Sequence, residues 1–357
     1  MERLKKIPIL FMSCIFLLCS TACGDKTWAL KSDNRTISTS TYVYQLMQFY
    51  QDASDKLIEK GISTTDIKNE ELEGQNASNW IKEHAIDSCK EMLAVDKILS
   101  DMNLSLADEE KKKAQEKTDA IWEASGEVYE KNFGINKDSV HQANSLFAAK
   151  KKKIFSALYG KDGINPVSDE QLLEYYKHNY ISLKFYSKMP FEDADSEGGE
   201  GQSQSGKVDT EEFIEQQFSG YVSAINSGTK NINQIQSEIK ATDHIENNAD
   251  SLEDQLVNPN STELPKEIVD AISTIEPGKA TYVKYNDIYL FLYRNPNSNN
   301  IELPDLTNES DREKILYDMK SDDFNKKIED TKNNLTINLN NDVINKYEPT
   351  MFSKTTN

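Results

Sequence analysis

Histidine, cysteine and carboxylate side chains are the residues of this sequence that could bind a metal or act as acid, base or nucleophile. The histidines are scattered, and none belongs to an HExxH pair or another recognised ligand spacing: His84, His141, His178 and His244. We expect each to serve on a helix face or at the surface. The sequence has no Cys-x-x-Cys pair and no glycine loop that could cradle a phosphate, so no cofactor and no metal is expected.

An acidic run offers one candidate cation site. Residues 193–198 (Asp-Ala-Asp-Ser-Glu-Gly) resemble the start of an EF-hand calcium loop, but the twelfth position is Gln204 instead of a bidentate glutamate. Residues 192–208 are mostly Glu, Asp, Gly, Ser and Gln with no apolar anchor. We therefore expect a disordered, solvated loop, and calcium binding is the alternative.

Cys23 has the clearest chemical role, attachment of a lipid. Three basic residues within the first six precede an apolar run over residues 9–18, and Ser20-Thr21-Ala22 then lead to Cys23. This order is typical of a secretory signal peptide, and the run is too short for a permanent membrane-spanning helix. A cysteine directly after Ala22 resembles the bacterial lipobox, although Ser20 stands where that motif usually has leucine. Cys19 is a poorer candidate, and a signal peptide without a lipid is the alternative.

Composition limits the partners of the mature chain. The formal charge of the 357 residues is −19, and removal of the basic signal peptide makes the mature chain more acidic still. An acidic surface argues against nucleic acid, which needs a basic face, so the lysine run 150–153 is interpreted as a solvated helix face. Only Cys89 would remain beside Cys23, which excludes a disulfide framework. Cys89 lies on an apolar helix face and is expected to be a small core residue.

Apolar spacing predicts a helical first half and a mixed second half. Residues three and four apart predict helices, and alternation predicts strands. Ser168 with Gln171 predicts a capping box, and Asn286-Asp287 predicts a two-residue hairpin loop. The expected helices lie near 40–61, 78–99, 107–131, 138–159, 168–180, 210–227, 232–239, 267–273 and 309–332. The expected strands are 28–31, 181–186, 280–285, 288–293 and a tail within 335–343. Residues 62–78 are expected to form a polar loop.

The second half also resembles a known family. The segment from Ser168 through Tyr180 into strand 181–186 is similar to the entry into the parvulin domain of PrsA-type and SurA-type foldases. The helix Leu264 to Ile272, the Pro277-Gly278 turn and the hairpin 280–293 resemble the end of that domain. The strand, polar turn and helix at the N-terminus and the C-terminal helix and tail resemble the chaperone domain of the family.

The resemblance implies an α+β fold with a mostly helical, SurA-like chaperone domain completed by the C-terminal helix and an inserted, small parvulin-like α/β domain. The expected organisation is a signal peptide (1–22), the chaperone-like domain (23–165), the parvulin-like domain (166–300) and a returning C-terminal segment (301–357). The implied partners are unfolded or exported polypeptides, bound from the extracytoplasmic face of a bacterial cell membrane. Four aromatic side chains on the first helix have two interpretations: they bind unfolded polypeptides, or they form an aromatic seam of the core. They are Tyr42, Tyr44, Phe49 and Tyr50.

The catalytic pattern of that family is missing. Parvulins carry one histidine on the first strand and one on the last, and the corresponding positions fall near Phe185 and Tyr289. Residues 240–257, where the family has a Gly-Gly stretch, contain no glycine. His244 beside Asp243 is the one group that could replace a lost catalytic residue. We therefore expect a chaperone without isomerase catalysis. The alternatives are an active prolyl isomerase, a small-ligand-binding lipoprotein and a purely structural envelope protein.

Overall fold

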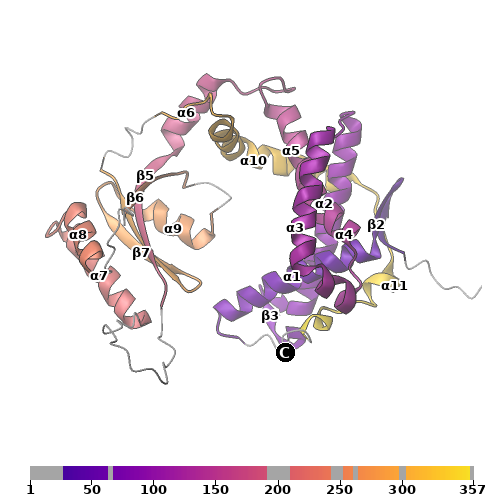
Figure 1. Ribbon diagram of the computed structural model, residues 1–357, viewed down its shortest axis with the longest axis horizontal. Coiled ribbons are helices and arrows are strands. Elements are labelled where there is room, and N and C mark those ends of the chain that lie inside the picture. Colours follow the sequence, from indigo (N-terminus) through magenta and orange to yellow (C-terminus); the bar gives the residue numbers. More distant parts are fainter. Residues whose placement is uncertain are drawn as a thin grey trace, which may run out of the picture. The chain divides into compact units, whose positions relative to one another are not determined.

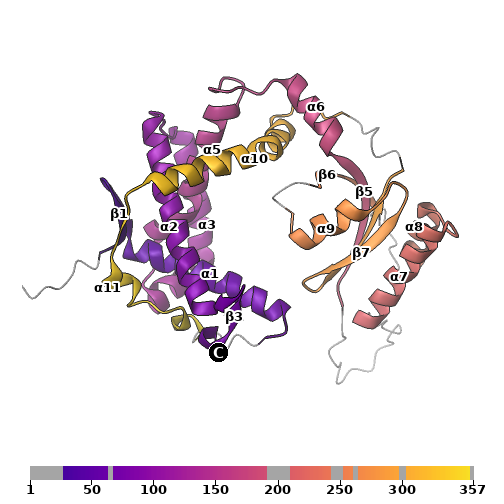
Figure 2. The ribbon, with the colours of Figure 1, turned by 180° about the vertical axis from the view of Figure 1, so that it is seen from behind.

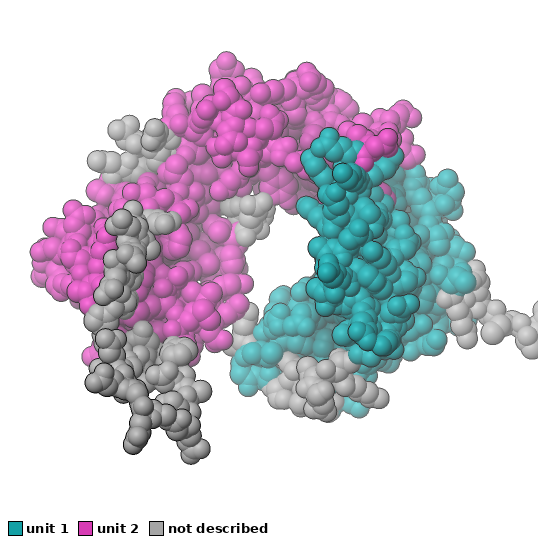
Figure 3. Space-filling model, in the orientation of Figure 1, with its two compact units in different colours: residues 1–96, 109–147, 334–357 teal, residues 97–108, 148–333 magenta. Residues whose placement is uncertain are grey.

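The computed structural model describes residues 27–62, 67–190, 210–242, 252–259, 264–296 and 303–353 (Figure 1). The signal peptide with Cys23, the acidic run 192–208 and His244 lie outside the described residues. The described chain is mostly helical with small antiparallel sheets, so the predicted α+β class is confirmed. It divides into two compact units, unit 1 (1–96, 109–147 and 334–357) and unit 2 (97–108 and 148–333), which Figure 3 colours separately.

Unit 1 is built around a small antiparallel sheet and long helices. The sheet has the order β2-β1-β9, and a separate hairpin pairs β3 with β4. The C-terminal strand reaches the sheet through the pair Leu30↔Leu339. The elements are β1 (Trp28–Ser32), β2 (Arg35–Ser38), α1 (Thr39–Glu59), β3 (Glu71–Leu72), β4 (Gln75–Asn76), α2 (Ala77–Asp101, ending in unit 2), α3 (Asp108–Phe133), α4 (Lys137–Val140), β9 (Asn338–Leu339) and α11 (Asn341–Ile344).

The aromatic residues of α1 form core contacts. Tyr42 and Tyr44 are buried, and Phe49 and Tyr50 are partly buried against the same cluster. Ring pairs join Tyr44 to Tyr129, Phe49 to Trp80 and Tyr50 to Phe352 at centroid distances of 6.0, 6.2 and 5.5 Å. These four side chains therefore belong to a core seam, which is the second of the two interpretations given above.

Two elements of unit 1 differ from the sequence prediction. The expected helix 138–159 is interrupted by a π-helical turn, His141–Ser145, before α5 (Leu146–Tyr159). The buried Gln45 side chain donates to the main-chain oxygen of Ala143 in that turn, at 3.5 Å. The expected tail strand shrinks to β9, because Asn341 begins α11.

The hairpin β3–β4 stands where a polar loop was expected. Its loop residues Glu73 and Gly74 have φ of 53° and 82°, the left-handed backbone that a type I′ turn requires. The Glu73 carboxylate accepts from Lys56 Nζ at 2.6 Å and from the Trp80 indole N–H at 2.9 Å. These hydrogen bonds lower the pKa of Glu73. The hairpin is thus fixed to α1 and α2 by one side chain.

Acid should loosen this hairpin in a way that depends on Glu73. A carboxyl whose pKa is lower in the folded state contributes stability above its unfolded pKa and loses it as pH falls through the folded value. Between about pH 5 and pH 3, unit 1 should therefore lose more stability in the wild type than in Glu73→Gln. The difference between the two losses should be less than about 1 kcal/mol, because Glu73 is half-exposed.

Tryptophan fluorescence during thermal unfolding measures this directly, since Trp28, Trp80 and Trp122 all lie in unit 1. Glu71→Gln, an exposed acid on the same hairpin, is the matched control. Equal acid sensitivity of the two variants would contradict the assignment.

Unit 2 contains a four-stranded antiparallel sheet of order β6-β5-β8-β7. The predicted hairpin is confirmed, with Tyr285 paired to Ile288 around Asn286-Asp287. Figure 2 shows α7 and α9 on opposite sides of the sheet. The elements are α5, α6 (Asp169–Asn179), β5 (Ile181–Lys188), α7 (Glu211–Ser227), α8 (Ile232–Thr242), β6 (Glu253–Val257), α9 (Lys266–Thr274), β7 (Ala280–Tyr285), β8 (Ile288–Arg294) and α10 (Glu309–Asn334).

Candidate functional site

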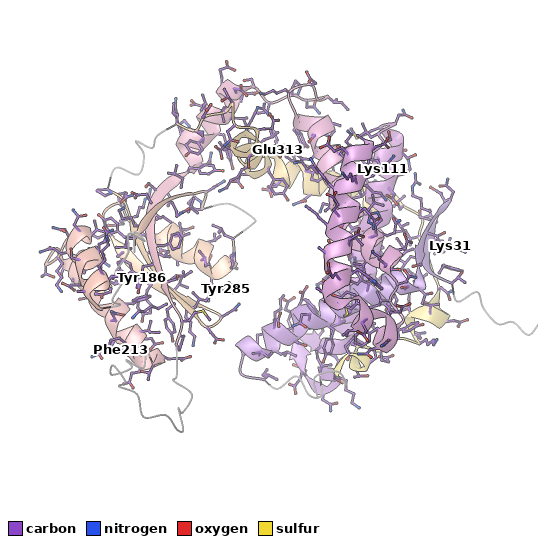
Figure 4. All side chains as sticks on the ribbon, in the orientation of Figure 1. Lys31, Lys111, Tyr186, Phe213, Tyr285 and Glu313 are labelled. Carbon is purple, nitrogen blue, oxygen red and sulfur yellow. The ribbon has the colours of Figure 1, made fainter. Side chains whose placement is uncertain are left out.

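The two faces of the unit 2 sheet are packed differently. Alternate residues of β5 and β8 point to opposite faces. One face packs on α7 and α8 in a core that includes Phe218, Tyr289 and Phe291, with Tyr186 partly buried against it; Figure 4 shows Tyr186 and Phe213 of α7 on this side. The other face packs on α9 in a smaller cluster that includes Leu183 and Leu292. We call these the α7 face and the α9 face.

Phe185 and Tyr289, the two positions singled out from the sequence, lie on different faces. Phe185 pairs with Leu292 and is 36% exposed, and Tyr289 pairs with Lys188 and is fully buried in the α7 core. The Tyr289 hydroxyl reaches Glu215 Oε1 on α7 at 3.2 Å. The structure therefore does not bring the two side chains together, and they form no common site.

The α9 face is hollowed into a pocket of about 320 Å³. Strands β5, β6 and β8, helix α9 and two residues of α10 surround it, and apolar side chains form most of its lining. Phe185 is the half-exposed aromatic residue among them. The apolar lining residues are Leu183, Phe185, Leu256, Val257, Leu264, Ile268, Ile272, Leu290 and Leu292.

This pocket was not predicted from the sequence, although part of its signal is visible there. Ile268 and Ile272 are spaced four apart on α9, and Leu264 precedes the helix at the same spacing, so this segment presents one apolar stripe to the sheet. The helix was predicted near 267–273, but the sequence alone does not show that its stripe fails to cover β5 and β6. Lys314 and Asp318 of α10, distant in sequence, also line the pocket.

A network of polar groups borders the pocket. The Tyr180 hydroxyl donates to Asp318 Oδ2, the Tyr175 hydroxyl donates to the Asp318 main-chain oxygen at 3.0 Å, and Asn258 Nδ2 donates to the Tyr175 hydroxyl at 2.8 Å. Burial, and next the hydrogen bond to Asp318, raise the pKa of Tyr180. Tyr180 is therefore neutral at physiological pH and donates to α10. Tyr175 links α6 both to α10 and to Asn258, which directly follows β6.

A second network ties α10 to the start of α6. Arg312 is buried; its Nε donates to Asp169 Oδ1 and its terminal nitrogen to the Val167 main-chain oxygen, both at 2.8 Å. The capping box predicted from Ser168 and Gln171 is confirmed and begins α6 at the same point. A buried guanidinium needs its carboxylate partner, because an unpaired charge in a protein interior is costly.

Replacing Asp169 by alanine should therefore destabilise unit 2 by about 2 kcal/mol, a value reduced for the half-exposed carboxylate. Urea unfolding followed by tyrosine circular dichroism gives the free energy. Glu170→Ala is the matched control, since Glu170 is the neighbouring acid in the first turn of α6 and is exposed. A loss no larger than that of the control would show that Asp169 does not neutralise Arg312.

The described histidines have local partners and do not line the pocket. His84 stacks on Trp80 at 3.8 Å, His141 Nδ1 contacts the Thr118 hydroxyl at 2.9 Å, and His178 Nδ1 contacts the Glu174 main-chain oxygen at 2.8 Å. Among the described residues, no group of three or more His, Cys, Asp or Glu side chains is arranged to hold a metal ion.

Two further residue types were interpreted from the sequence. Cys89 is fully buried, which raises the pKa of its thiol and agrees with a core role. In the lysine run, Lys152 Nζ pairs with Glu313 Oε2 of α10 at 2.7 Å.

Within the described ranges, no helix is both long enough and apolar enough to cross a membrane.

Solved structures similar to this chain include three foldase proteins named PrsA. No protein-family model matches the chain, and no curated protein sequence matches it. A crystal structure of the foldase PrsA from Streptococcus pneumoniae has a TM-score of 0.34 and 11% identity over 74% of this chain and 92% of that one. PrsA from Lactococcus lactis has a TM-score of 0.31 and 10% identity over 92% of this chain and 99% of that one. PrsA from Bacillus subtilis has a TM-score of 0.21 and 12% identity over 94% of each chain. Scores this low do not establish a common fold.

Proposed function

We propose that this chain is an extracytoplasmic, membrane-anchored chaperone of the foldase type, which binds unfolded exported polypeptides without catalysing prolyl isomerisation. The observation that carries the proposal is the apolar pocket on the α9 face, with the half-exposed Phe185 at its lining. An unfolded polypeptide exposes apolar side chains that a folded one buries, and an apolar pocket binds them by removing their surface from water.

The composition of the pocket favours loose recognition. A preformed apolar cavity with few polar groups selects for apolar character and size more than for one particular residue. A buried apolar side chain contributes about 1.5–3 kcal/mol when it leaves water completely. One pocket of this kind supports weak, reversible binding of many clients, which is what a chaperone needs.

Catalysis would require more than this pocket offers. The barrier to rotation about a prolyl bond comes from amide resonance, and an isomerase must place polar groups where they favour the twisted amide. Among the described lining residues, Tyr180 and Asp318 are hydrogen-bonded to each other, the amides belong to Gln255 and Asn258, and Lys314 is the one cationic group. We therefore assign binding to the pocket, and an active isomerase is the outcome that would overturn this assignment.

The anchor is the lipid proposed for Cys23. The described chain begins at Thr27 and enters β1 at Trp28, so a lipid at Cys23 would hold unit 1 within a few residues of the membrane. Each buried CH2 of an acyl chain contributes about 0.8 kcal/mol, and two chains are enough for stable anchoring. Metabolic labelling with a palmitate analogue, lost in Cys23→Ser, tests the anchor.

The function is tested with soluble residues 24–357 in two assays run side by side. The first measures how far the protein suppresses aggregation of a chemically unfolded client, and the second measures isomerisation of a short prolyl reporter peptide. Suppressed aggregation with isomerisation at the spontaneous rate supports the proposal. Isomerisation well above that rate would identify an enzyme, and no effect in either assay would overturn the chaperone function.

A further inference from the structure

Strand β7 forms an edge of the unit 2 sheet and offers unused hydrogen-bonding groups. Its neighbour in the described chain is β8 on one side only. In an antiparallel pair closed by a two-residue loop, alternate residues bond to the partner strand. Tyr285, Val283 and Thr281 therefore bond to β8, in agreement with the next such bond, from Arg294 N–H to the Lys279 oxygen at 3.0 Å. The N–H and C=O groups of the residues between them point away from β8.

A side chain of α7 already occupies the first of these outward positions. The main-chain N–H of Ala280 donates to Asn226 Oδ1 at 2.9 Å, and Asn226 Nδ2 donates to the Ala280 oxygen at 2.9 Å. A carboxamide has the hydrogen-bonding groups of a peptide unit. Asn226 thus takes the place that a peptide group of a fifth strand would take at Ala280.

Beyond Ala280, the outward groups of Tyr282 and Lys284 have no partner in the described part of the chain. Natural sheets protect such edges with proline, a bulge or a charged side chain that projects over the edge. β7 has no proline and pairs regularly with β8. Its Lys284 side chain is held at the α7 face, with Nζ 2.8 Å from Glu211 Oε1 and over the Tyr289 ring at 5.1 Å.

We propose that β7 binds an extended segment of an unfolded polypeptide as a fifth strand, across the main-chain groups of Tyr282 and Lys284. This inference rests on the proposed function and adds a second contact to it. Strand addition takes its affinity from main-chain hydrogen bonds, which every polypeptide can form, so the edge is independent of client sequence. The pocket on the α9 face selects apolar side chains, and Asn226 sets where the added strand must end.

Hydrogen exchange followed by mass spectrometry tests the edge. The protein, as residues 24–357, is saturated with a reduced and carboxymethylated protein that stays unfolded. Fragments covering β7 should gain protection at about two amides, those of Tyr282 and Lys284, while the β7 amides that bond to β8 are already protected. A short peptide of alternating Val and Thr should give the same protection, and its alternately N-methylated form should not.

A pair of variants at Lys284 separates the main chain from the side chain. Lys284→Pro removes the outward N–H, which an edge strand tolerates, and Lys284→Ala removes the same side-chain contacts but keeps the N–H. We expect Lys284→Ala to bind the peptide as the wild type does and Lys284→Pro to bind it roughly fivefold more weakly. The exchange measurement on the wild type does not depend on how either variant folds.

The outcomes distinguish the edge from the proposed function. Client binding with unchanged exchange at Tyr282 and Lys284 overturns the edge alone, because binding itself persists. No client binding overturns both. Protection that appears without client and grows with protein concentration would mean that a second copy of this chain occupies the edge, which also overturns the proposal.

Discussion

Phe185→Thr is expected to weaken binding of an unfolded client about tenfold while unit 2 stays folded. Phe185 lines the pocket on the α9 face and is 36% exposed, so its ring is available to a client. Truncating an aromatic anchor at the centre of a binding site typically costs more than 1 kcal/mol, and about 1.4 kcal/mol corresponds to tenfold. Threonine keeps a high strand propensity, so the central strand β5 should still form.

The matched control for this experiment is Met189→Thr. Met189 is 60% exposed, follows β5 directly and does not line the pocket. Client affinity is measured by fluorescence anisotropy of a labelled unfolded protein, and folding by tyrosine circular dichroism. If both variants lost affinity equally, general surface hydrophobicity would explain binding. If neither did, the pocket would not be the client site.

The sequence was sufficient to predict elements whose local signals are strong. The capping box at Ser168 and Gln171 and the hairpin loop at Asn286-Asp287 depend on a few neighbouring residues, and both are present. Apolar residues spaced four, four, three and four apart predicted α1, because this spacing fixes one buried face: Tyr42, Leu46, Tyr50, Ala53 and Leu57. Such patterns need no knowledge of the rest of the chain.

The pocket could not be predicted because its parts meet only in three dimensions. Phe185, Ile268 and Asp318 come from a strand and two helices far apart in the sequence. Alternation along β5 and β8 shows that successive residues point to opposite faces, but the face that helix α7 covers depends on packing. The family resemblance implied that Phe185 and Tyr289 occupy the two positions of one site, whereas the register of β5 with β8 puts them on different faces.

Tyr289→His is expected to destabilise unit 2 by about 2–4 kcal/mol and to leave prolyl isomerisation at the spontaneous rate. Tyr289 is fully buried in the α7 core, where its ring packs beside Phe291 and Lys284. The smaller imidazole leaves a cavity and buries polar nitrogen atoms without the partners they have in water. Because the α9 pocket is on the other face, the new side chain cannot reach a bound proline there.

Tyr289→Phe is the matched control for that substitution. It keeps the ring and removes only the hydroxyl contacts with Glu211 and Glu215, which are 3.5 and 3.2 Å long and lie at the edge of the core. Its free energy of unfolding, from urea titration, should change by less than about 1 kcal/mol. A Tyr289→His variant that stayed as stable as Tyr289→Phe would contradict the burial of this position. One that gained isomerase activity would mean that Tyr289 does face the substrate, and would return it to the role that the family resemblance implied.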